Sequence, residues 1–293
     1  MTSRLAVAAG ASAAIIVGAS VPVTGMLQDY PLLTGQAMRY GLSGLVLLAW
    51  TYARGQRPVP PRLSDVPALL ALVVFGMLGF TAALLYSQRY AEPGFVAAML
   101  GGTPVVLALA SKRRSAAVVA GAAVVALGVV VLSGGGAWHG PGLLLAALAL
   151  CGEAGFTLFA VGVVRRLGGV SVATWCCLLA AAAGGVVGTF AGGWQVPTLK
   201  QGVALLALAV VLTAIAFGLW YFAVGRLGAD RAGVLIGLMP ISGLVVSVSL
   251  GAQEFTALSL AGATIVAVGC VVGLSSSTRA RPRVGTVEPV PAS

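Results

Sequence analysis

The chain has 293 residues, of which 59% are hydrophobic and only 8% are charged. Soluble domains carry about 25% charged residues, so this composition excludes a soluble globular protein and indicates a membrane protein embedded in a lipid bilayer. A net charge of +10 would suggest nucleic-acid binding in a soluble chain. Here the basic residues form short groups between apolar segments, a pattern of membrane topology, and we expect no nucleic-acid partner.

Metal and cofactor chemistry has little support in the residue types. The four cysteines Cys151, Cys176, Cys177 and Cys270 lie inside apolar segments without a C-x-x-C spacing, which is typical of small packing residues. His139 is the single histidine, so paired-histidine ligation within one chain is excluded. The sequence predicts no metal site and no cofactor.

Apolar segments long enough to cross a bilayer recur along almost the whole chain. A span needs about 20 apolar residues, and ten segments approach that length. We predict spans at roughly 5–25, 32–52, 66–87, 93–111, 116–133, 141–163, 172–191, 202–224, 231–251 and 257–275. The first could also be a signal peptide, but nine further segments favour a retained span. Residues 276–293 carry arginines and prolines and are predicted to form a disordered cytoplasmic tail.

The loops between these spans differ sharply in basic residues. Alternate loops assigned to one side hold fourteen of the seventeen basic residues, whereas the other side holds Arg89 and Lys200, and Arg39 lies inside a span. The positive-inside rule then predicts a multi-pass protein of the cell membrane with both termini in the cytoplasm.

A short glycine-bearing helix occurs twice in the sequence. Residues 120–131 and 261–272 are identical at eight of twelve positions. Gly121 and Gly128 are seven residues apart, as are Gly262 and Gly269, so each pair lies on one helix face and permits close backbone approach. We expect both helices to pack at the periphery through these faces, with a homodimer contact as a further role.

The repeat predicts the architecture. The first repeat covers residues 1–133 and the second residues 134–275, with five spans in each. Because five is odd, the second copy enters the membrane from the opposite face. The predicted fold is therefore an all-α membrane protein with ten transmembrane helices in two inverted five-helix repeats, an organisation typical of secondary transporters whose substrate sits between the repeats.

Several motifs in this order resemble the EamA family of ten-helix permeases in the drug/metabolite transporter superfamily. They are Val17–Pro22, Pro31–Tyr40, the two glycine-bearing helices and Arg165 with Arg166 at the end of the sixth span. The resemblance extends to about residue 276. It implies a permease rather than an enzyme, one that exports or exchanges a small metabolite such as an amino acid or amine by alternating access.

Two charged residues lie inside predicted spans. Glu153 is about twelve residues into the sixth span, where a carboxylate costs roughly 2.5–3.5 kcal/mol on the insertion scale. It is a candidate site for a substrate ammonium group or a coupled proton, and the alternative is a structural carboxyl. Arg39 could extend to the outer headgroups, or descend towards Glu153 and neutralise it. Both residues are candidate substrate ligands.

A Gly-x-x-Pro motif falls near the middle of the fourth and the ninth span. It consists of Gly101 with Pro104 in the first half and Gly237 with Pro240 in the second. Proline frees a helix carbonyl and can serve as a bending point, although a tolerated kink is common in membrane helices. Its recurrence favours a pair of hinges.

Aromatic residues mark opposite ends of the third and eighth spans. Tyr86 lies near the outer end of the third, and Trp220 and Tyr221 lie near the inner end of the eighth. Aromatic belts favour this depth in any membrane protein. The alternative is a gate or substrate wall, where cation–π contact would suit an amine.

Two other classes of function remain open. Gly41–Gly44 reads G-x-S-G, as in intramembrane serine proteases, but a serine nucleophile needs a histidine base and His139 belongs to a short outer loop. A non-transporting membrane scaffold is the other alternative. Saturable flux in vesicles would favour a transporter, and loss of function on Ser43→Ala would favour the protease.

Overall fold

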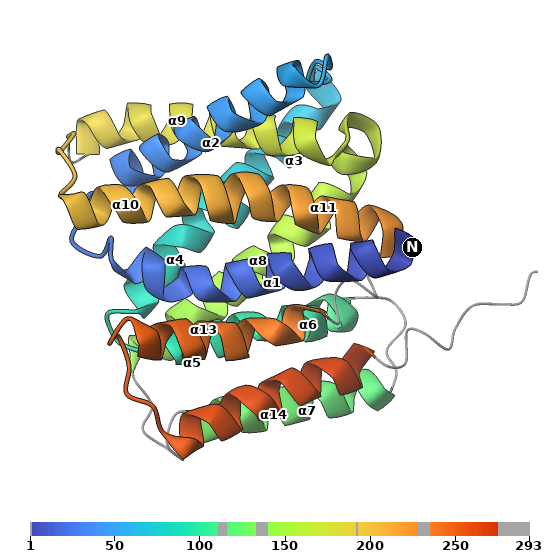
Figure 1. The fold of residues 1–293 in the computed structure, drawn as a ribbon, viewed down its shortest axis with the longest axis vertical. Coiled ribbons are helices and arrows are strands. Elements are labelled where there is room, and N and C mark those ends of the chain that lie inside the picture. The colour runs from blue at the N-terminus through green and yellow to red at the C-terminus, as the bar shows by residue number, and fades with distance from the viewer. Residues whose placement is uncertain (1, 111–115, 133–139, 192, 228–234, 275–293) are drawn as a thin grey trace, which may run out of the picture.

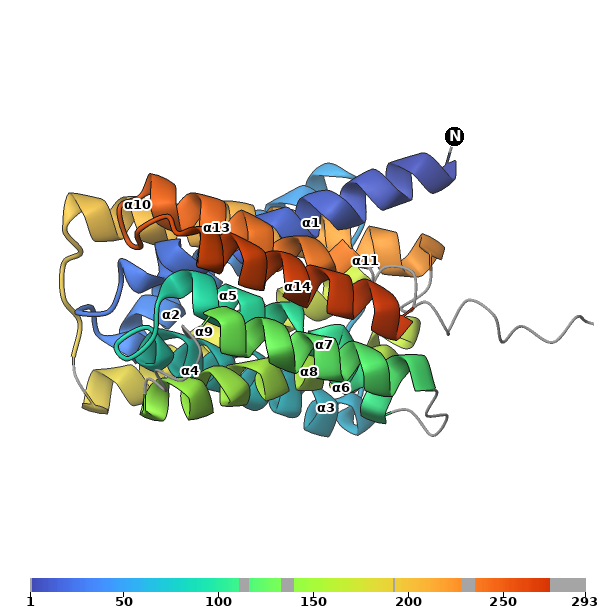
Figure 2. The ribbon, with the colours of Figure 1, turned by 90° about the horizontal axis from the view of Figure 1, so that it is seen from below.

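The protein is a bundle of helices that run side by side (Figures 1 and 2). The computed structural model describes residues 2–110, 116–132, 140–191, 193–227 and 235–274, and all regular structure within these ranges is helical. In the first half the α-helices are α1 (Thr2–Gly25), α2 (Leu32–Ala53), α3 (Val66–Ala71), α4 (Phe80–Ser87), α5 (Pro93–Gly101), α6 (Thr103–Ala110) and α7 (Ala116–Leu132). In the second half they are α8 (Pro141–Leu167), α9 (Gly169–Ala191), α10 (Leu199–Ala207), α11 (Ala216–Leu227), α13 (Met239–Ser249) and α14 (Ala257–Leu274).

Helices occupy each of the ten predicted ranges, and their ends differ from the predictions by a few residues. Five helical stretches are long and apolar enough to cross a membrane: Arg4–Gly25, Leu63–Ser87, Pro141–Ala160, Gly169–Ala191 and Leu199–Ala223. Shorter apolar helices lie at 93–107, 119–132, 236–249 and 257–273. These findings confirm an all-helical membrane protein. The predicted tail 276–293 lies outside the described residues.

Two of the long helices contain an internal π-helical segment that the sequence did not predict. Leu72–Gly79 joins α3 to α4, and Leu208–Ile215 joins α10 to α11. These segments occupy the middle of the third and eighth predicted spans, which are corresponding positions in the two proposed repeats. A π-helix is rare and is often found at functional sites, because its wider turn redirects side chains and carbonyl groups.

The fourth and ninth predicted spans are interrupted at their glycine–proline motifs. In the fourth, α5 ends at Gly101 and α6 begins at Thr103. In the ninth, a 3-10 turn at Ile236–Leu238 precedes α13, whose first residues include Pro240. The interruptions therefore fall at the two motifs where the sequence predicts a bend or kink, and Gly102 and the tight turn break the regular hydrogen-bond ladder there.

Polar contacts connect the loops at each end of the bundle. At one end Arg166 forms an ion pair with Asp65, and the indole of Trp175 donates to the carbonyl of Val59. At the opposite end the hydroxyl of Tyr30 donates to the carbonyl of Gln195. Each of these contacts joins the first half of the chain to the second half.

The helices α7 and α14 pack directly against each other along one edge of the bundle (Figure 1). A Cβ atom added at Gly128 would lie 2.8 Å from the backbone nitrogen of Val266 and 3.0 Å from the carbonyl oxygen of Gly262. A Cβ at Gly269 would lie 3.0 Å from the carbonyl oxygen of Gly121. The two glycine faces are therefore occupied by each other within one chain, and a homodimer would have to use a different surface.

Candidate functional site

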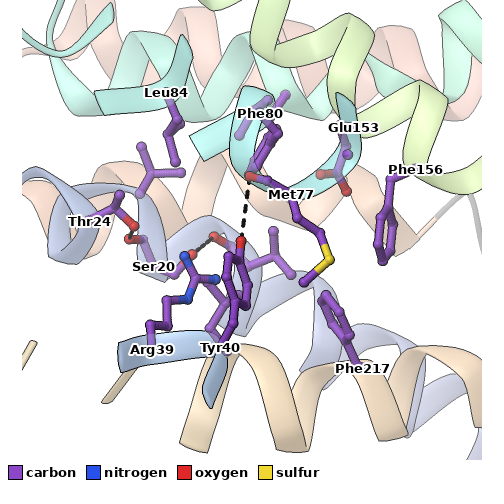
Figure 3. Close-up of a pocket in the computed structure, with 15 residues that line it drawn as sticks. Ser20, Thr24, Arg39, Tyr40, Met77, Phe80, Leu84, Glu153, Phe156 and Phe217 are labelled. Atoms are coloured by element: carbon purple, nitrogen blue, oxygen red, sulfur yellow. Dashed lines mark hydrogen bonds between the residues drawn. The ribbon is translucent and has the colours of Figure 1, made fainter. Parts of the chain in front are cut away.

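A small cavity lies inside the bundle, between α1, α2, α4, α5, α8, α11 and the two π-helical segments (Figure 3). Its volume is about 50 Å³. A water molecule needs about 10–15 Å³ measured in this way, whereas pockets for small molecules usually measure about 300–1,000 Å³. The cavity has room for a few water molecules and must widen to hold a metabolite.

Apolar clusters adjoin the cavity on the sides that face the two ends of the bundle. One cluster includes Leu27, Tyr30 and Leu85 and reaches the cavity through Leu212. Another includes Leu69, Leu167 and Val172, and it reaches the cavity through Tyr40 and Met77. Large apolar side chains therefore lie between the cavity and each end of the bundle.

Arg39 on α2 is buried at the cavity wall, with 4% of its surface exposed. Its Nε and Nη2 atoms donate to the hydroxyl of Thr213 at 3.3 and 3.2 Å, and its Nη1 donates to Oε1 of Gln36 at 3.1 Å. The guanidinium also lies 4.8 Å from the ring centroid of Tyr40. Arg39 therefore does not extend to the headgroups, as one sequence interpretation proposed, because neutral polar partners hold it inside the protein.

Glu153 on α8 lines the opposite part of the same cavity (Figure 3). Its backbone carbonyl accepts from Thr157, but among the described residues its carboxylate has no hydrogen bond and no ion pair. The helix α8 can bring Glu153 this close because Gly152, the preceding residue, lies against the backbone of Phe75 and Phe80. The structure gives no support to the structural alternative, in which this carboxyl would be hydrogen-bonded within the bundle.

Arg39 and Glu153 do not pair with each other in this conformation. The ion pair that the structure records between described side chains joins Arg166 to Asp65. The predicted mutual neutralisation of Arg39 and Glu153 is therefore wrong for this state, because Thr213 and Gln36 hold the guanidinium. The buried Arg39 and the partly exposed Glu153 carry opposite charges and line one cavity, and each lacks a charged partner among the described residues.

Aromatic side chains form the wall of the cavity beside Glu153. The rings of Phe156 and Phe217 are 5.2 Å apart between centroids, and those of Phe217 and Tyr221 are 6.2 Å apart with an edge-to-face geometry. Phe156 and Phe217 line the cavity, whereas Tyr221 follows one turn later. The hydroxyl of Tyr221 is buried without a hydrogen-bond partner among the described residues. A buried hydroxyl of this kind is costly unless a ligand or water pairs with it.

The other two predicted aromatic ligands lie away from the cavity. Tyr86 is 44% exposed near the end of α4, where its ring stacks with the guanidinium of Arg89. Trp220 packs in a small cluster with Ala14, Ile236 and Met239. These positions fit the belt or gate interpretations better than direct contact with a molecule in the central cavity.

The glycine–proline motifs of the two halves meet each other. A Cβ added at Gly101 would overlap the ring of Pro240, and the thiol of Cys270 on α14 donates to the carbonyl of Gly101. Gly237 lies near Ala267 and Cys270. Pro104 lies in the second residue position of α6. The two interruptions are therefore adjacent parts of one contact between α5, α13 and α14.

The serine of the protease-like motif has a structural role. Ser43 is fully buried, and its hydroxyl lies within hydrogen-bonding distance of the carbonyls of Arg39 and Ala209. It joins α2 to the second π-helical segment. His139 lies outside the described residues.

Sequence reasoning missed several residues around the cavity. Thr213 and Gln36 hold Arg39, and Phe156 and Phe217 form the aromatic wall. Ser20 is a polar lining residue on α1. Apolar spans contain many such residues, so their type alone carries no signal.

The arrangement of helices and the cavity can be compared with known proteins. The model of the EamA-like transporter family matches residues 140–274. The chain is 24% identical over 279 residues to the uncharacterized transporter YetK of Bacillus subtilis (strain 168), covering 90% of this chain and 83% of YetK. A protein of known crystal structure has a similar fold, with a TM-score of 0.68 over 94% of this chain and 98% of its own, at 21% identity.

The helical bundle and its buried charged cavity are those of a membrane transporter. The second half of the chain matches the model of the EamA-like transporter family, and most of the chain is similar to a protein named as a transporter. The likeness to the solved structure shows the fold alone, because the sequence identity is low.

Proposed function

We propose that this protein is a secondary transporter for a small zwitterionic metabolite of the amino-acid type. The observation that carries the proposal is that Arg39 and Glu153 line one cavity and that neither has an ion-pair partner among the described residues. A buried charge without a partner is strongly destabilising, so such groups persist mainly where a ligand completes them. A zwitterion would place its carboxylate at Arg39 and its ammonium group at Glu153.

The apolar wall supports the same class of substrate. Phe156 and Phe217 would contact the side chain of the substrate, and Met77 would add a flexible surface that adapts to several shapes. The unpaired hydroxyl of Tyr221 lies next to this wall and would serve substrates that carry a polar group. An amine without a carboxylate would leave Arg39 unpaired and is the weaker candidate.

The proposed architecture is ten membrane spans in two inverted five-helix repeats, with both termini in the cytoplasm of the cell. Support comes from features that recur in both halves. The π-helical segments occur in the third and eighth spans, the interruptions in the fourth and ninth, and the fifth and tenth spans pack together as α7 and α14. The basic loops set the orientation.

Alternating access is the proposed mechanism. The conformation with this narrow cavity of about 50 Å³ would be an intermediate between an inward-open and an outward-open state. Opening needs movement between the halves, and the contact of Gly101 with Pro240 is the proposed hinge. The direction is efflux or exchange, and Glu153 is a site where proton coupling would act, since a proton and an ammonium group would compete for one carboxylate.

Two observations weigh against the alternatives. Ser43 is buried in a helix–helix contact, which does not suit a protease nucleophile. A scaffold without transport has no need for a cavity lined by unpaired charges.

Counterflow in reconstituted vesicles tests the proposed function. Vesicles loaded with unlabelled L-leucine, L-alanine or L-phenylalanine should accumulate the labelled amino acid when the protein is present. Arg39→Gln and Glu153→Gln should each reduce accumulation at least about 10-fold, since each removes one charged contact. Empty vesicles and vesicles with Thr174→Val, which removes a buried hydroxyl from α9 away from the cavity, are the controls. Equal flux with and without the protein for all three amino acids would contradict the proposal.

A further inference from the structure

Thr213 connects the second π-helical segment to Arg39. Its hydroxyl donates to the carbonyl of Leu208, five residues earlier, and accepts two N–H groups of Arg39. By comparison Thr24 and Thr174, in regular α-helices, each donate to the carbonyl four residues earlier. The direction of the Thr213 hydroxyl therefore depends on the π-helical turn that contains it.

The second π-helical segment has a further contact with α2. The hydroxyl of Ser43, one turn after Arg39, lies 3.0 Å from the carbonyl of Ala209. Thr213 is fully buried at this junction. The guanidinium is thus held against a defined surface of the segment rather than free to move within the cavity.

These contacts leave two N–H groups of the guanidinium without a hydrogen-bond partner among the described residues. Arginine has five N–H groups, and Thr213 and Gln36 accept three of them. One N–H remains on each terminal nitrogen. Two such groups form the fork that binds both oxygens of a carboxylate.

We propose that Thr213 is a positioning residue that directs the free N–H fork of Arg39 to a substrate carboxylate and so sets the selectivity for free acids over their amides. This inference rests on the proposed function. The π-helical geometry directs the hydroxyl proton of Thr213 to the carbonyl of Leu208. Both lone pairs of the hydroxyl oxygen can then accept N–H groups of Arg39. A carboxamide carries no negative charge and cannot form the charge-assisted pair with Arg39. Its binding therefore depends little on how Thr213 orients the guanidinium.

The transport test compares substrates that differ only at the carboxylate. For L-leucine, Thr213→Val should raise KM about 10- to 100-fold with kcat changed less than about twofold, because one hydroxyl that orients a charged group is lost. For L-leucinamide the KM should stay within about twofold. Thr213→Ser keeps the hydroxyl and should restore the wild-type values. The matched control Thr174→Val removes a buried hydroxyl from α9 and should leave both substrates unaffected.

A second readout does not depend on transport. Phenylglyoxal modifies free guanidinium groups, and mass spectrometry of peptides reports the rate at Arg39. That rate should rise several-fold in Thr213→Val and stay at the wild-type value in Thr213→Ser and Thr174→Val. If wild-type protein transports neither leucine nor its amide while the rate still rises, the proposed function fails but the positioning by Thr213 holds. Unchanged selectivity together with an unchanged modification rate in Thr213→Val would overturn the inference.

Discussion

Arg39 and Glu153 lie on opposite parts of one buried cavity without forming an ion pair (Figure 3). Neutral groups of Thr213 and Gln36 hold the guanidinium, and the carboxylate has no partner among the described side chains. Opposite charges at one cavity attract each other strongly in a low-dielectric interior. In the proposed function a zwitterion would lie between them once the cavity widens.

Glu153→Gln tests the charge of the carboxylate while the size and shape of the side chain stay nearly the same. If Glu153 binds the ammonium group, the variant should lose at least about 10-fold in leucine counterflow, because the amide keeps the size but not the charge. N-acetyl-leucine has no ammonium group and should be handled equally by wild type and variant. Normal exchange of leucine with a lost response to a pH gradient would assign Glu153 to proton coupling instead.

Gly128→Leu should destabilise the pair α7 and α14. A side chain at this position meets the backbone of the partner helix, which cannot move aside locally, and we expect a loss of at least about 1–3 kcal/mol. The matched control is Gly162→Leu, because a Cβ at Gly162 meets nothing within 4 Å. Thermal unfolding in detergent measures both. Equal melting temperatures for the two variants would contradict the observed packing.

Gly101 and Pro240 should be energetically coupled. Gly101→Ala alone should slow transport and lower the melting temperature, because the new methyl group overlaps the proline ring. Pro240→Ala removes that ring, so the double variant should recover most of the loss. A double-mutant cycle gives the coupling. Additive effects within about 0.5 kcal/mol would mean that the two residues act independently and would remove the proposed hinge contact.

The ion pair of Asp65 with Arg166 should stabilise the end of the bundle where the two halves meet. Asp65 is 7% exposed and also accepts from the backbone nitrogen of Arg62, whereas Arg166 is partly exposed, so we expect Asp65→Asn to cost about 1–2 kcal/mol. Arg166→Gln should cost less. In the double variant the decrease in melting temperature should be smaller than the sum of the two single decreases. A decrease equal to that sum would exclude a direct interaction.

The proposed orientation predicts which of two introduced cysteines a membrane-impermeant thiol reagent labels from outside the cell. Val196 is 94% exposed and Leu63 is 92% exposed, and they lie in loops assigned to opposite sides. In a cysteine-free background Val196→Cys should react with an impermeant thiol reagent in intact cells, whereas Leu63→Cys should react only after permeabilisation. The proposed cytoplasmic side of the second loop rests on the arginines at 54, 57 and 62 and the positive-inside rule. The reverse pattern would invert the topology.

The glycine-bearing helices show which part of the helix packing the sequence predicts and which part it does not. The spacing of Gly121 with Gly128 and of Gly262 with Gly269 predicts helix faces that permit close approach. In the structure the two faces meet inside one chain. A small-residue face shows that a backbone can come near but does not identify which backbone, so the homodimer interpretation could not be separated from internal packing.

The sequence by itself determined the class of protein and the positions of its helices. Low charge and long apolar segments exclude a soluble fold, because only helices satisfy their backbone groups within a bilayer. It also identified Arg39 and Glu153, since a charge inside a span is costly enough to require a reason.

Only the tertiary structure decided what surrounds those charges. Thr213 is 174 residues from Arg39 along the chain, and its hydroxyl is directed by a π-helical turn within an apolar segment that has no distinguishing composition. The absence of an Arg39–Glu153 pair also depends on this contact. Local sequence sets helix position through burial and periodicity, but the partner of a buried polar group is chosen by packing between distant helices.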